Sequence, residues 1–319
     1  AEAILQRDPR YVFLAARGTS DHAGLYAKYL WGAHNGLPLA LAATSLFSIY
    51  EEAPRLRDAF VVGISQSGQS PDILSVVDNG RQQGCLTLAI TNCPDSPMGR
   101  AAEYVIDISA GPERAVAATK TYTAQLMAIA MLSAALEGPE VREARLQELR
   151  AIPAAIASVL QLWDDLERVA ERYRYIDQCV VLGRGYNYAT AFEWSLKLKE
   201  LAYVVAEPYS SADFQHGPIA IVGPGFPVFA VAPKDRVLPD MIKLLRRLKD
   251  EFDAELLVVS DDEEALSLAR SPVQVPSVPM WLSPLVHIVA GQMFCTHLTR
   301  AKGYDTEQPR GLSKVTKTS

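Results

Sequence analysis

The chain has 319 residues, of which 49% are hydrophobic and 21% charged, and its formal net charge is −6. Its length predicts about two domains, and its composition excludes a largely disordered chain. The acidic balance argues against a nucleic-acid partner, because phosphate backbones require clustered Lys and Arg. No apolar run is long enough to cross a membrane. The four cysteines and five histidines show no metal-ligand or redox spacing, so we expect no metal and a reducing, cytoplasmic location.

Short apolar runs alternate with longer amphipathic stretches along the whole chain. In the first half, the pattern predicts strands at residues 11–16, 59–64, 87–91 and 104–108, then a helix over about 115–136 and a polar connector over 138–150. In the second half it predicts strands at 178–183, 227–232, 255–260 and 273–275. The alternation predicts an α/β fold, with a mainly parallel sheet flanked by helices in each half.

Similar segments recur at nearly the same separation in the two halves. Arg17-Gly18 follows the first strand, and Arg184-Gly185 follows its counterpart 167 positions later. Pro71-Asp72-Ile73-Leu74 is matched by Pro239-Asp240-Met241-Ile242, 168 positions later. Two matches in register with the strand order indicate an internal duplication. We therefore predict two similar domains, at residues 9–150 and 165–305, and a short C-terminal tail at 306–319.

The segment Ser65-Gln66-Ser67-Gly68-Gln69-Ser70 links a predicted buried strand to a helix that we expect to begin at Pro71, with Ser70 as its N-cap. Hydroxyl, amide and backbone N–H donors at a helix N-terminus are what a phosphate dianion requires, and Gly68 would let the backbone approach it closely. An ordinary serine-rich turn is the alternative. No Gly-Lys-Ser/Thr follows, which disfavours a nucleotide P-loop. The second half has Ala232-Pro233-Lys234-Asp235 at the matching place, so we expect one phosphate site per chain.

Two further polar residues, Thr19 and Ser20, follow the first predicted strand. Because the carboxyl ends of neighbouring parallel strands meet at one edge of a sheet, both are candidates to bind the same ligand. The alternative is that Ser20 only caps the next helix.

A predicted helix over 191–205 contains candidate acid–base residues. Glu193 and Lys197 are spaced i,i+4, and Lys197 and Glu200 are spaced i,i+3. The alternative is that these charges lie on a solvated helix face. The neighbouring residues, however, are apolar on nearly every side, which indicates that the helix is mostly buried. Buried charges need partners or a functional role. His216 precedes Gly217-Pro218 in a predicted turn; a lone loop histidine is usually inert, although it titrates near neutrality and suits proton transfer. Lys314 lies in a tail expected to fray.

Six motifs occur in order along nearly the whole chain: Arg17-Gly18-Thr19-Ser20, Ser65-Gln66-Ser67-Gly68, Ala115-Val116-Ala117-Ala118-Thr119-Lys120, Leu196-Lys197-Leu198-Lys199-Glu200, His216-Gly217-Pro218 and Gln308-Pro309-Arg310. Together they resemble the tandem sugar-isomerase (SIS) domains found in the isomerase half of glucosamine-6-phosphate synthase and in stand-alone glucosamine-6-phosphate deaminases.

The resemblance implies a role for each matching residue. It implies that the phosphate of a sugar phosphate is bound by Ser65, Gln66, Ser67 and Ser70, and the rest of the sugar by Thr19, Ser20 and the backbone near Val116. Glu200 would move a proton between C1 and C2, and Lys197 would stabilise the enediolate. His216 would open the sugar ring, reaching the site from the partner subunit of a homodimer, and Lys314 would form an imine with the ketose. It implies no metal or organic cofactor.

This sequence departs from the synthase in three respects. Arg17 stands in place of a cysteine, Ala118 stands in place of a serine that contacts the sugar, and we find no N-terminal cysteine of a glutaminase domain. Without an ammonia donor, we expect an amino-sugar phosphate deaminase or isomerase that converts glucosamine 6-phosphate to fructose 6-phosphate and ammonia. A fructosamine-6-phosphate deglycase and a non-catalytic sugar-phosphate sensor remain as alternatives. The presence of Glu200, His216 and Lys314 together argues against the sensor, because binding alone needs no base.

Overall fold

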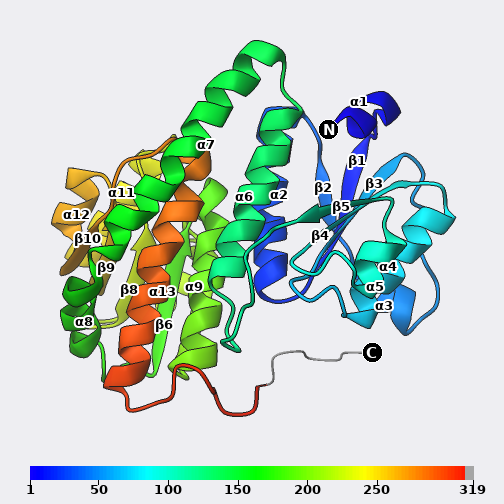
Figure 1. Ribbon diagram of the computed structural model, residues 1–319. Helices are drawn as coiled ribbons and strands as arrows, with labels where there is room; N and C mark the ends of the chain where they lie inside the picture. Colours follow the sequence, from blue (N-terminus) through cyan, green and yellow to red (C-terminus); the bar gives the residue numbers. More distant parts are fainter. Residues whose placement is uncertain (313–319) are drawn as a thin grey trace. The chain divides into compact units, whose positions relative to one another are not determined.

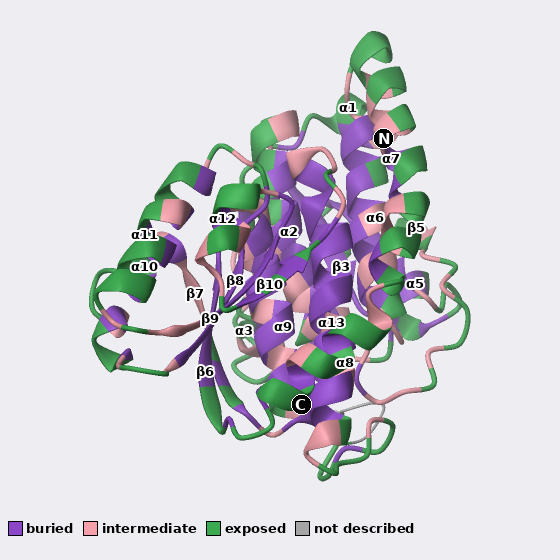
Figure 2. Cartoon of the chain, turned by 90° about the vertical axis from the view of Figure 1, so that its left-hand side faces the viewer, coloured by how far each residue is buried: buried purple, intermediate pink, exposed green. Residues whose placement is uncertain are grey.

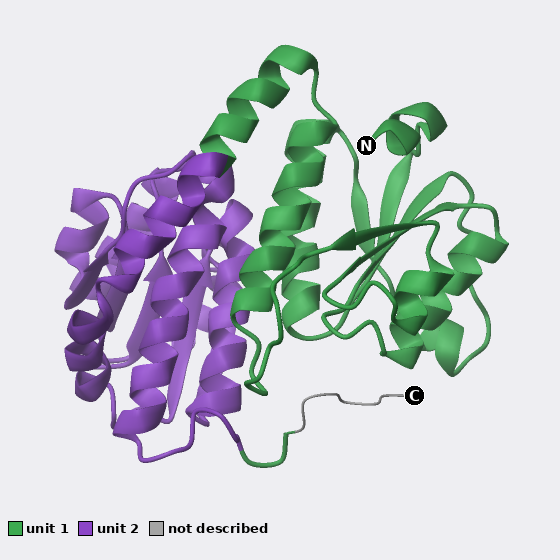
Figure 3. Cartoon of the chain, in the orientation of Figure 1, with its two compact units in different colours: residues 1–149, 310–319 green, residues 150–309 purple. Residues whose placement is uncertain are grey.

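The computed structural model of the protein describes residues 1–312. The chain divides into two compact units (Figure 3). Unit 1 comprises Ala1–Leu149 together with the described residues from Arg310, and unit 2 comprises Arg150–Pro309. The boundary lies within helix α7 (Pro139–Leu160).

Unit 1 contains a five-stranded parallel sheet with the strand order β2-β1-β3-β4-β5 (Figure 1). Its strands are β1 (Tyr11–Ala15), β2 (Leu39–Leu41), β3 (Ala59–Ile64), β4 (Leu86–Thr91) and β5 (Tyr104–Asp107). Its helices are α1 (Glu2–Arg7), α2 (Thr19–Asn35), α3 (Ser45–Ser48), α4 (Pro71–Gln82), α5 (Pro97–Ala101) and α6 (Lys120–Ala135).

Helices cover both faces of this sheet, and β3 and β4 are therefore buried at every position. On one face, where α2 and α6 pack together, Phe60 lies against Trp31 of α2 with ring centroids 6.4 Å apart. The next residue, Val61, belongs to the opposite face and packs in a cluster with Ile73 and Val77 of α4. Alternating side chains of one strand thus anchor helices of two layers.

Unit 2 contains a second five-stranded parallel sheet with the order β10-β9-β8-β6-β7. Its strands are β6 (Gln178–Gly183), β7 (Val205–Ser210), β8 (Pro227–Val231), β9 (Glu255–Ser260) and β10 (Ser271–Gln274). Its α-helices are α8 (Trp163–Arg172), α9 (Tyr188–Leu201), α10 (Ser211–Phe214), α11 (Leu238–Asp250), α12 (Glu263–Leu268) and α13 (Ser283–Ala301). Short 3₁₀ turns are η1 (Gly185–Asn187), η2 (Pro218–Ile221) and η3 (Met280–Leu282).

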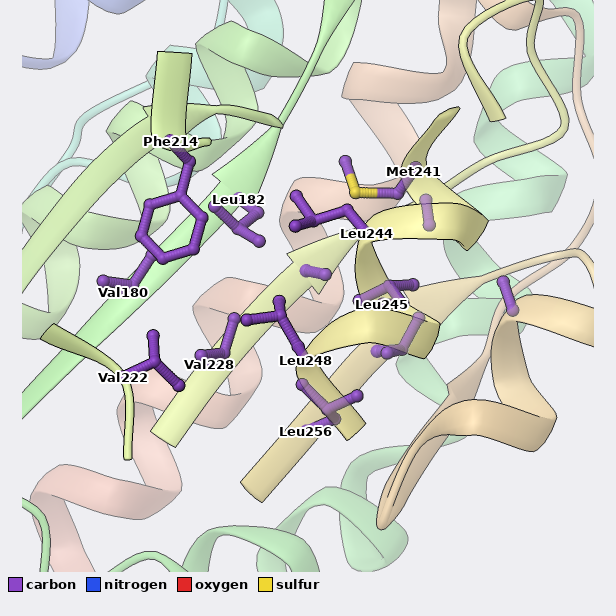
Figure 4. Packing of buried hydrophobic residues seen from close by; sticks show 14 of the residues in the cluster. Val180, Leu182, Phe214, Val222, Val228, Met241, Leu244, Leu245, Leu248 and Leu256 are labelled. Carbon is purple, nitrogen blue, oxygen red and sulfur yellow. The ribbon is translucent and has the colours of Figure 1, made fainter. Parts of the chain in front are cut away.

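The sheet of unit 2 is also packed on both faces, and β8 is buried along its whole length (Figure 2). On one face, Val228 of β8 packs with Leu244 and Leu248 of α11 (Figure 4). On the other face, the ring of Phe229 lies 5.4 Å from that of Trp194 on α9 and 5.2 Å from that of Phe294 on α13. Helix α9, which holds the candidate acid–base residues, is therefore fixed by an aromatic cluster.

The two sheets have the same topology. In each, the first strand of the unit pairs with the second on one side and with the third on the other, and the fourth and fifth follow outward. This repetition and the parallel pairing confirm the predicted α/β fold of two similar parallel-sheet domains. Among the described residues, no helix is both long and apolar enough to span a membrane.

The structure corrects several predicted elements. Strands β2 and β7, each at an edge of its sheet, were not predicted, because β2 has only three residues and β7 contains Pro208 and exposed charge. The predicted helix over 191–205 ends at Leu201, and the one over 115–136 begins only at Lys120. The predicted connector over 138–150 is helical and forms the first part of α7, because its Glu, Arg, Leu and Ala residues are strong helix formers.

One buried histidine of unit 2 leads to a prediction about pH. Burial lowers the pKa of His287 to about 4, although the nearby Asp261 opposes this shift. The unfolded chain, with a histidine pKa of about 6.5, takes up the proton first, so stability falls as the pH drops from about 6.5 to 4. We expect this residue alone to cost about 2 kcal/mol of unfolding free energy between pH 7 and pH 5. Urea unfolding of His287→Leu should show a shallower decline than wild type, and equal declines would contradict the assignment.

Candidate active site

The loops after β1 and β3 leave the sheet of unit 1 at the same edge. These strands are parallel neighbours, with Ala15 of β1 paired to Gly63 of β3. The strand order also reverses here, because β2 follows on the far side of β1 while β4 follows on the far side of β3. Open α/β sheets bind ligands at the carboxyl edge of such a point. The structure thus brings together, within unit 1, the two polar segments that the sequence singled out.

The serine loop 65–70 is shaped by its own side chains. Ser65 Oγ accepts a hydrogen bond from the Gly68 N–H at 3.1 Å, and Ser67 Oγ accepts one from the Gln69 N–H at 3.3 Å. Helix α4 begins at Pro71 with Ser70 in the N-cap position, as predicted. The Ser70 side chain, however, makes no capping hydrogen bond to the helix terminus.

Gly68 is required by the fold of this loop. Its φ of +61° lies in the left-handed region, and a Cβ atom added there would lie 2.0 Å from Ser96 Oγ. Ser96 is the N-cap of α5, and the Gly68 carbonyl accepts a hydrogen bond from the Met98 N–H at 3.1 Å. The loop is therefore packed directly onto the start of α5. This contact explains the glycine without the anion approach that the sequence suggested.

Thr19 and Ser20 lie in the first turn of α2, whose N-cap is Gly18. The alternative that Ser20 caps this helix is wrong, because Ser20 is inside it. Its buried hydroxyl instead accepts a hydrogen bond from Gln125 Nε2 of α6 at 3.0 Å. Val116 lies half-buried in the irregular segment between β5 and α6.

In unit 2, helix α9 holds a compact trio of charges. Lys197 Nζ lies 2.5 Å from Glu200 Oε2 and 3.4 Å from Glu193 Oε1. The side chain of Lys197 is 1% exposed and that of Glu193 is 0% exposed, whereas Glu200 is 23% exposed. The alternative of a solvated helix face is therefore wrong. Glu200 is the member of the trio that reaches solvent.

The trio keeps its lysine charged. Burial by itself lowers the pKa of Lys197, but the two carboxylates outweigh it, and the net effect is a raised pKa. Glu193 was not among the predicted catalytic residues, although its i,i+4 spacing and apolar surroundings were visible in the sequence. It is fully buried one helical turn before Lys197 and is the second carboxylate that pairs with its ammonium group.

His216 follows α10 in an exposed turn, where its N–H donates to the Asp213 carbonyl at 3.0 Å. The turn needs a glycine next, because Gly217 has a φ of +145°. Within residues 1–312, no hydrogen bond or ion pair joins the His216 side chain to Lys197 or Glu200. Lys314, the predicted imine-forming residue, lies outside the described residues.

The loop of unit 2 that corresponds to the serine loop, between β8 and α11, has a different character. There the Lys234 N–H donates to the carboxylate of Asp261 at 2.7 Å. A backbone donor that already holds a carboxylate is not available to an anion. This supports the expectation of a single phosphate loop, in unit 1. In the part of the chain that the structure describes, no group of three or more His, Cys, Asp or Glu side chains is arranged to hold a metal ion.

Comparisons with known proteins agree with this architecture. The chain is 34% identical over 313 residues to the glutamine–fructose-6-phosphate aminotransferase (isomerizing) of Aquifex aeolicus, in a match that covers 97% of this chain and 52% of that relative. The chain thus spans about half the length of the curated relatives it matches.

Two solved structures are similar over nearly the whole chain. The C-terminal domain of the glucosamine-fructose-6-phosphate aminotransferase of Francisella tularensis has a TM-score of 0.88 and 27% identity, covering 97% of this chain and 89% of that one. A proposed phosphosugar isomerase of Silicibacter pomeroyi DSS-3 has a TM-score of 0.85 and 34% identity, covering 96% and 90%. The SIS domain family matches residues 6–135 in unit 1 and 174–298 in unit 2. The chain therefore belongs to the SIS domain family.

Proposed function

We propose that this protein is a sugar-phosphate isomerase that acts on an amino-sugar phosphate, converting glucosamine 6-phosphate and water to fructose 6-phosphate and ammonia. The observation that carries the proposal is the Lys197–Glu200 pair, in which a partly exposed carboxylate lies 2.5 Å from a buried ammonium group. The names of the similar proteins supply the substrate class, fructose 6-phosphate for the Aquifex relative and a phosphosugar for the Silicibacter protein.

Proton transfer between adjacent carbons of an open-chain sugar needs a base that reaches both. In the proposed reaction Glu200 removes the C2 proton of the ring-opened sugar and returns it to C1, so a C2–H bond breaks and a C1–H bond forms. One N–H proton of the C2 amine passes through solvent to the C1 oxygen, so that C1 becomes a primary alcohol and the amine becomes an imine. Water then hydrolyses the imine to the ketone and ammonia. C1 is reduced as C2 is oxidised, so no external oxidant is required. The Lys197 ammonium stabilises the negative charge that develops on the sugar oxygen.

The phosphate is assigned to unit 1. Ser65, Gln66, Ser67 and Ser70 contribute side-chain donors next to the N-terminus of the twelve-residue helix α4, whose dipole favours an anion. Thr19 and Ser20, at the same sheet edge, together with the backbone near Val116, are assigned to the rest of the sugar. The proposal thus gives binding to unit 1 and proton transfer to unit 2.

The decisive experiment is turnover by the purified protein. With glucosamine 6-phosphate as substrate, we expect equal amounts of ammonia and fructose 6-phosphate. Each product is measured with its own coupled enzyme assay. Interconversion of fructose 6-phosphate and glucose 6-phosphate with no ammonia released would replace the deaminase by a simple isomerase. Cleavage of fructosamine 6-phosphates with glucosamine 6-phosphate inert would point to a deglycase, and tight calorimetric binding without any product would point to a sensor.

We further propose that the active form is a homodimer in which His216 of the partner subunit serves the Glu200 site. The exposed position of His216, outside the Lys197 trio, supports this assignment. Each of the variants Glu200→Gln and His216→Ala should be inactive alone. After subunit exchange, confirmed by native mass spectrometry, an equal mixture should recover about a quarter of wild-type activity, because half of the dimers then hold one intact site. No recovery after proven exchange would exclude a shared site.

A further inference from the structure

Arg17 and Asp72 are joined next to the serine loop. Arg17 Nε donates to Asp72 Oδ2 at 2.7 Å, and a second guanidinium nitrogen donates to Thr44 Oγ1 at 2.5 Å. Thr44 Oγ1 in turn donates to Asp72 Oδ2 at 3.1 Å. Arg17 follows β1 and Asp72 belongs to α4, so the network connects the two loops of the candidate ligand edge.

The position of Asp72 is unfavourable for anion binding. It is the second residue of α4, directly after the serine loop, and its side chain is 0% exposed. A buried carboxylate in the first turn places negative charge at the same helix terminus that would attract a phosphate. Two anions at one helix terminus repel each other strongly where solvent is excluded. Binding of a phosphate therefore requires that the charge of Asp72 be compensated.

Arg17 is the side chain that provides this compensation. Its guanidinium contacts the Asp72 carboxylate directly, while 56% of the side chain stays exposed at the ligand edge. Asp21, in the first turn of α2, also interacts with it: burial raises the pKa of Asp21, and His22 and Arg17 oppose that shift. Arg17 thus places its positive charge directly against Asp72, at an edge that also holds Asp21.

We infer that Arg17 is a positioning residue that neutralises Asp72 and so makes the N-terminus of α4 available to the phosphate of the substrate. This inference rests on the proposed phosphate site in unit 1. It explains an arginine at the end of β1 that the proton-transfer chemistry does not use.

Unit 2 offers a matched control. Arg184 and Asp240 occupy the corresponding places after β6 and in α11, and Arg184 also donates to its aspartate, at 3.2 Å. Asp240 is 56% exposed, in contrast to the buried Asp72. The loop between β8 and α11 has no serines. Loss of Arg184 therefore removes a similar pair without touching the phosphate loop.

The test is calorimetric binding of fructose 6-phosphate, with unphosphorylated fructose as a second probe. We expect Arg17→Met to weaken binding of the phosphate ester about tenfold or more, Arg17→Met with Asp72→Asn to restore most of it, and Arg184→Met to change it little. Asp72→Asn alone should bind the ester about threefold or more tightly than wild type at low salt, an advantage that shrinks as ionic strength rises. If the Arg17–Asp72 pair had only a structural role, Asp72→Asn would not bind the phosphate ester more tightly than wild type.

The outcomes separate the inference from the proposed function. If wild type does not bind the ester, the proposed function fails and the inference fails with it. If wild type binds while Arg17→Met binds equally well, or Asp72→Asn alone binds no better than wild type, the inference alone is overturned. Because Asp72→Asn keeps the arginine, its result decides the question even where Arg17→Met does not fold.

Discussion

Replacing Glu200 by glutamine is expected to lower the turnover of glucosamine 6-phosphate by about a thousandfold. The amide has nearly the same shape as the carboxylate but cannot accept the C2 proton. Lys197 retains its second carboxylate, Glu193, at 3.4 Å, so the helix should keep its charge balance. The measurement is kcat from the ammonia and fructose 6-phosphate assays, together with calorimetric binding of fructose 6-phosphate. Binding should stay within about threefold of wild type, because the serine loop that we propose for the phosphate is unchanged.

The matched control is Glu207→Gln, which makes the same chemical change at an exposed position of β7. This variant should retain nearly full turnover. Undiminished turnover by Glu200→Gln would remove Glu200 from the role of base. An equal loss in the two glutamine variants would show that the effect does not come from proton transfer at Glu200.

The second large effect concerns stability and does not depend on the substrate. Lys197→Met should lower the free energy of unfolding by about 3–5 kcal/mol, because Glu193 is then left as a fully buried carboxylate without its cation. Urea unfolding, followed by the fluorescence of the four tryptophans, which include the buried Trp194 on the same helix, would measure the loss.

The control for this prediction is the double variant Glu193→Gln with Lys197→Met. Removing both charges leaves a polar but neutral pair, so most of the lost stability should return. If the single and double variants are equally unstable, the loss comes from packing of the lysine chain rather than from the unpaired charge. A Lys197→Met protein as stable as wild type would contradict the burial of the pair.

Features confined to one strand, loop or helix could be predicted from the sequence. The spacing of Glu193, Lys197 and Glu200 places them on one helix face whatever surrounds that helix. The serine loop could be placed because a buried strand and Pro71 bound it on either side. The central strands were predicted for the same reason, since a strand buried on both faces is a continuous apolar run. Strand β2 could not be predicted because a three-residue apolar run is too short to be distinctive, and β7 because Glu207 and Pro208 interrupt its apolar pattern.

By itself, the sequence determined the α/β class, the duplication, the serine loop and the local pairing on the acid–base helix. Only the tertiary structure decided that Arg17 meets Asp72, 55 positions away, and that Ser20 meets Gln125, 105 positions away. The tertiary structure also decided that Ser96 leaves no room for a side chain at position 68, and that Glu193 is fully buried and paired with Lys197. Local spacing follows from backbone geometry alone, whereas these contacts depend on which strands become neighbours and how the helices pack on them.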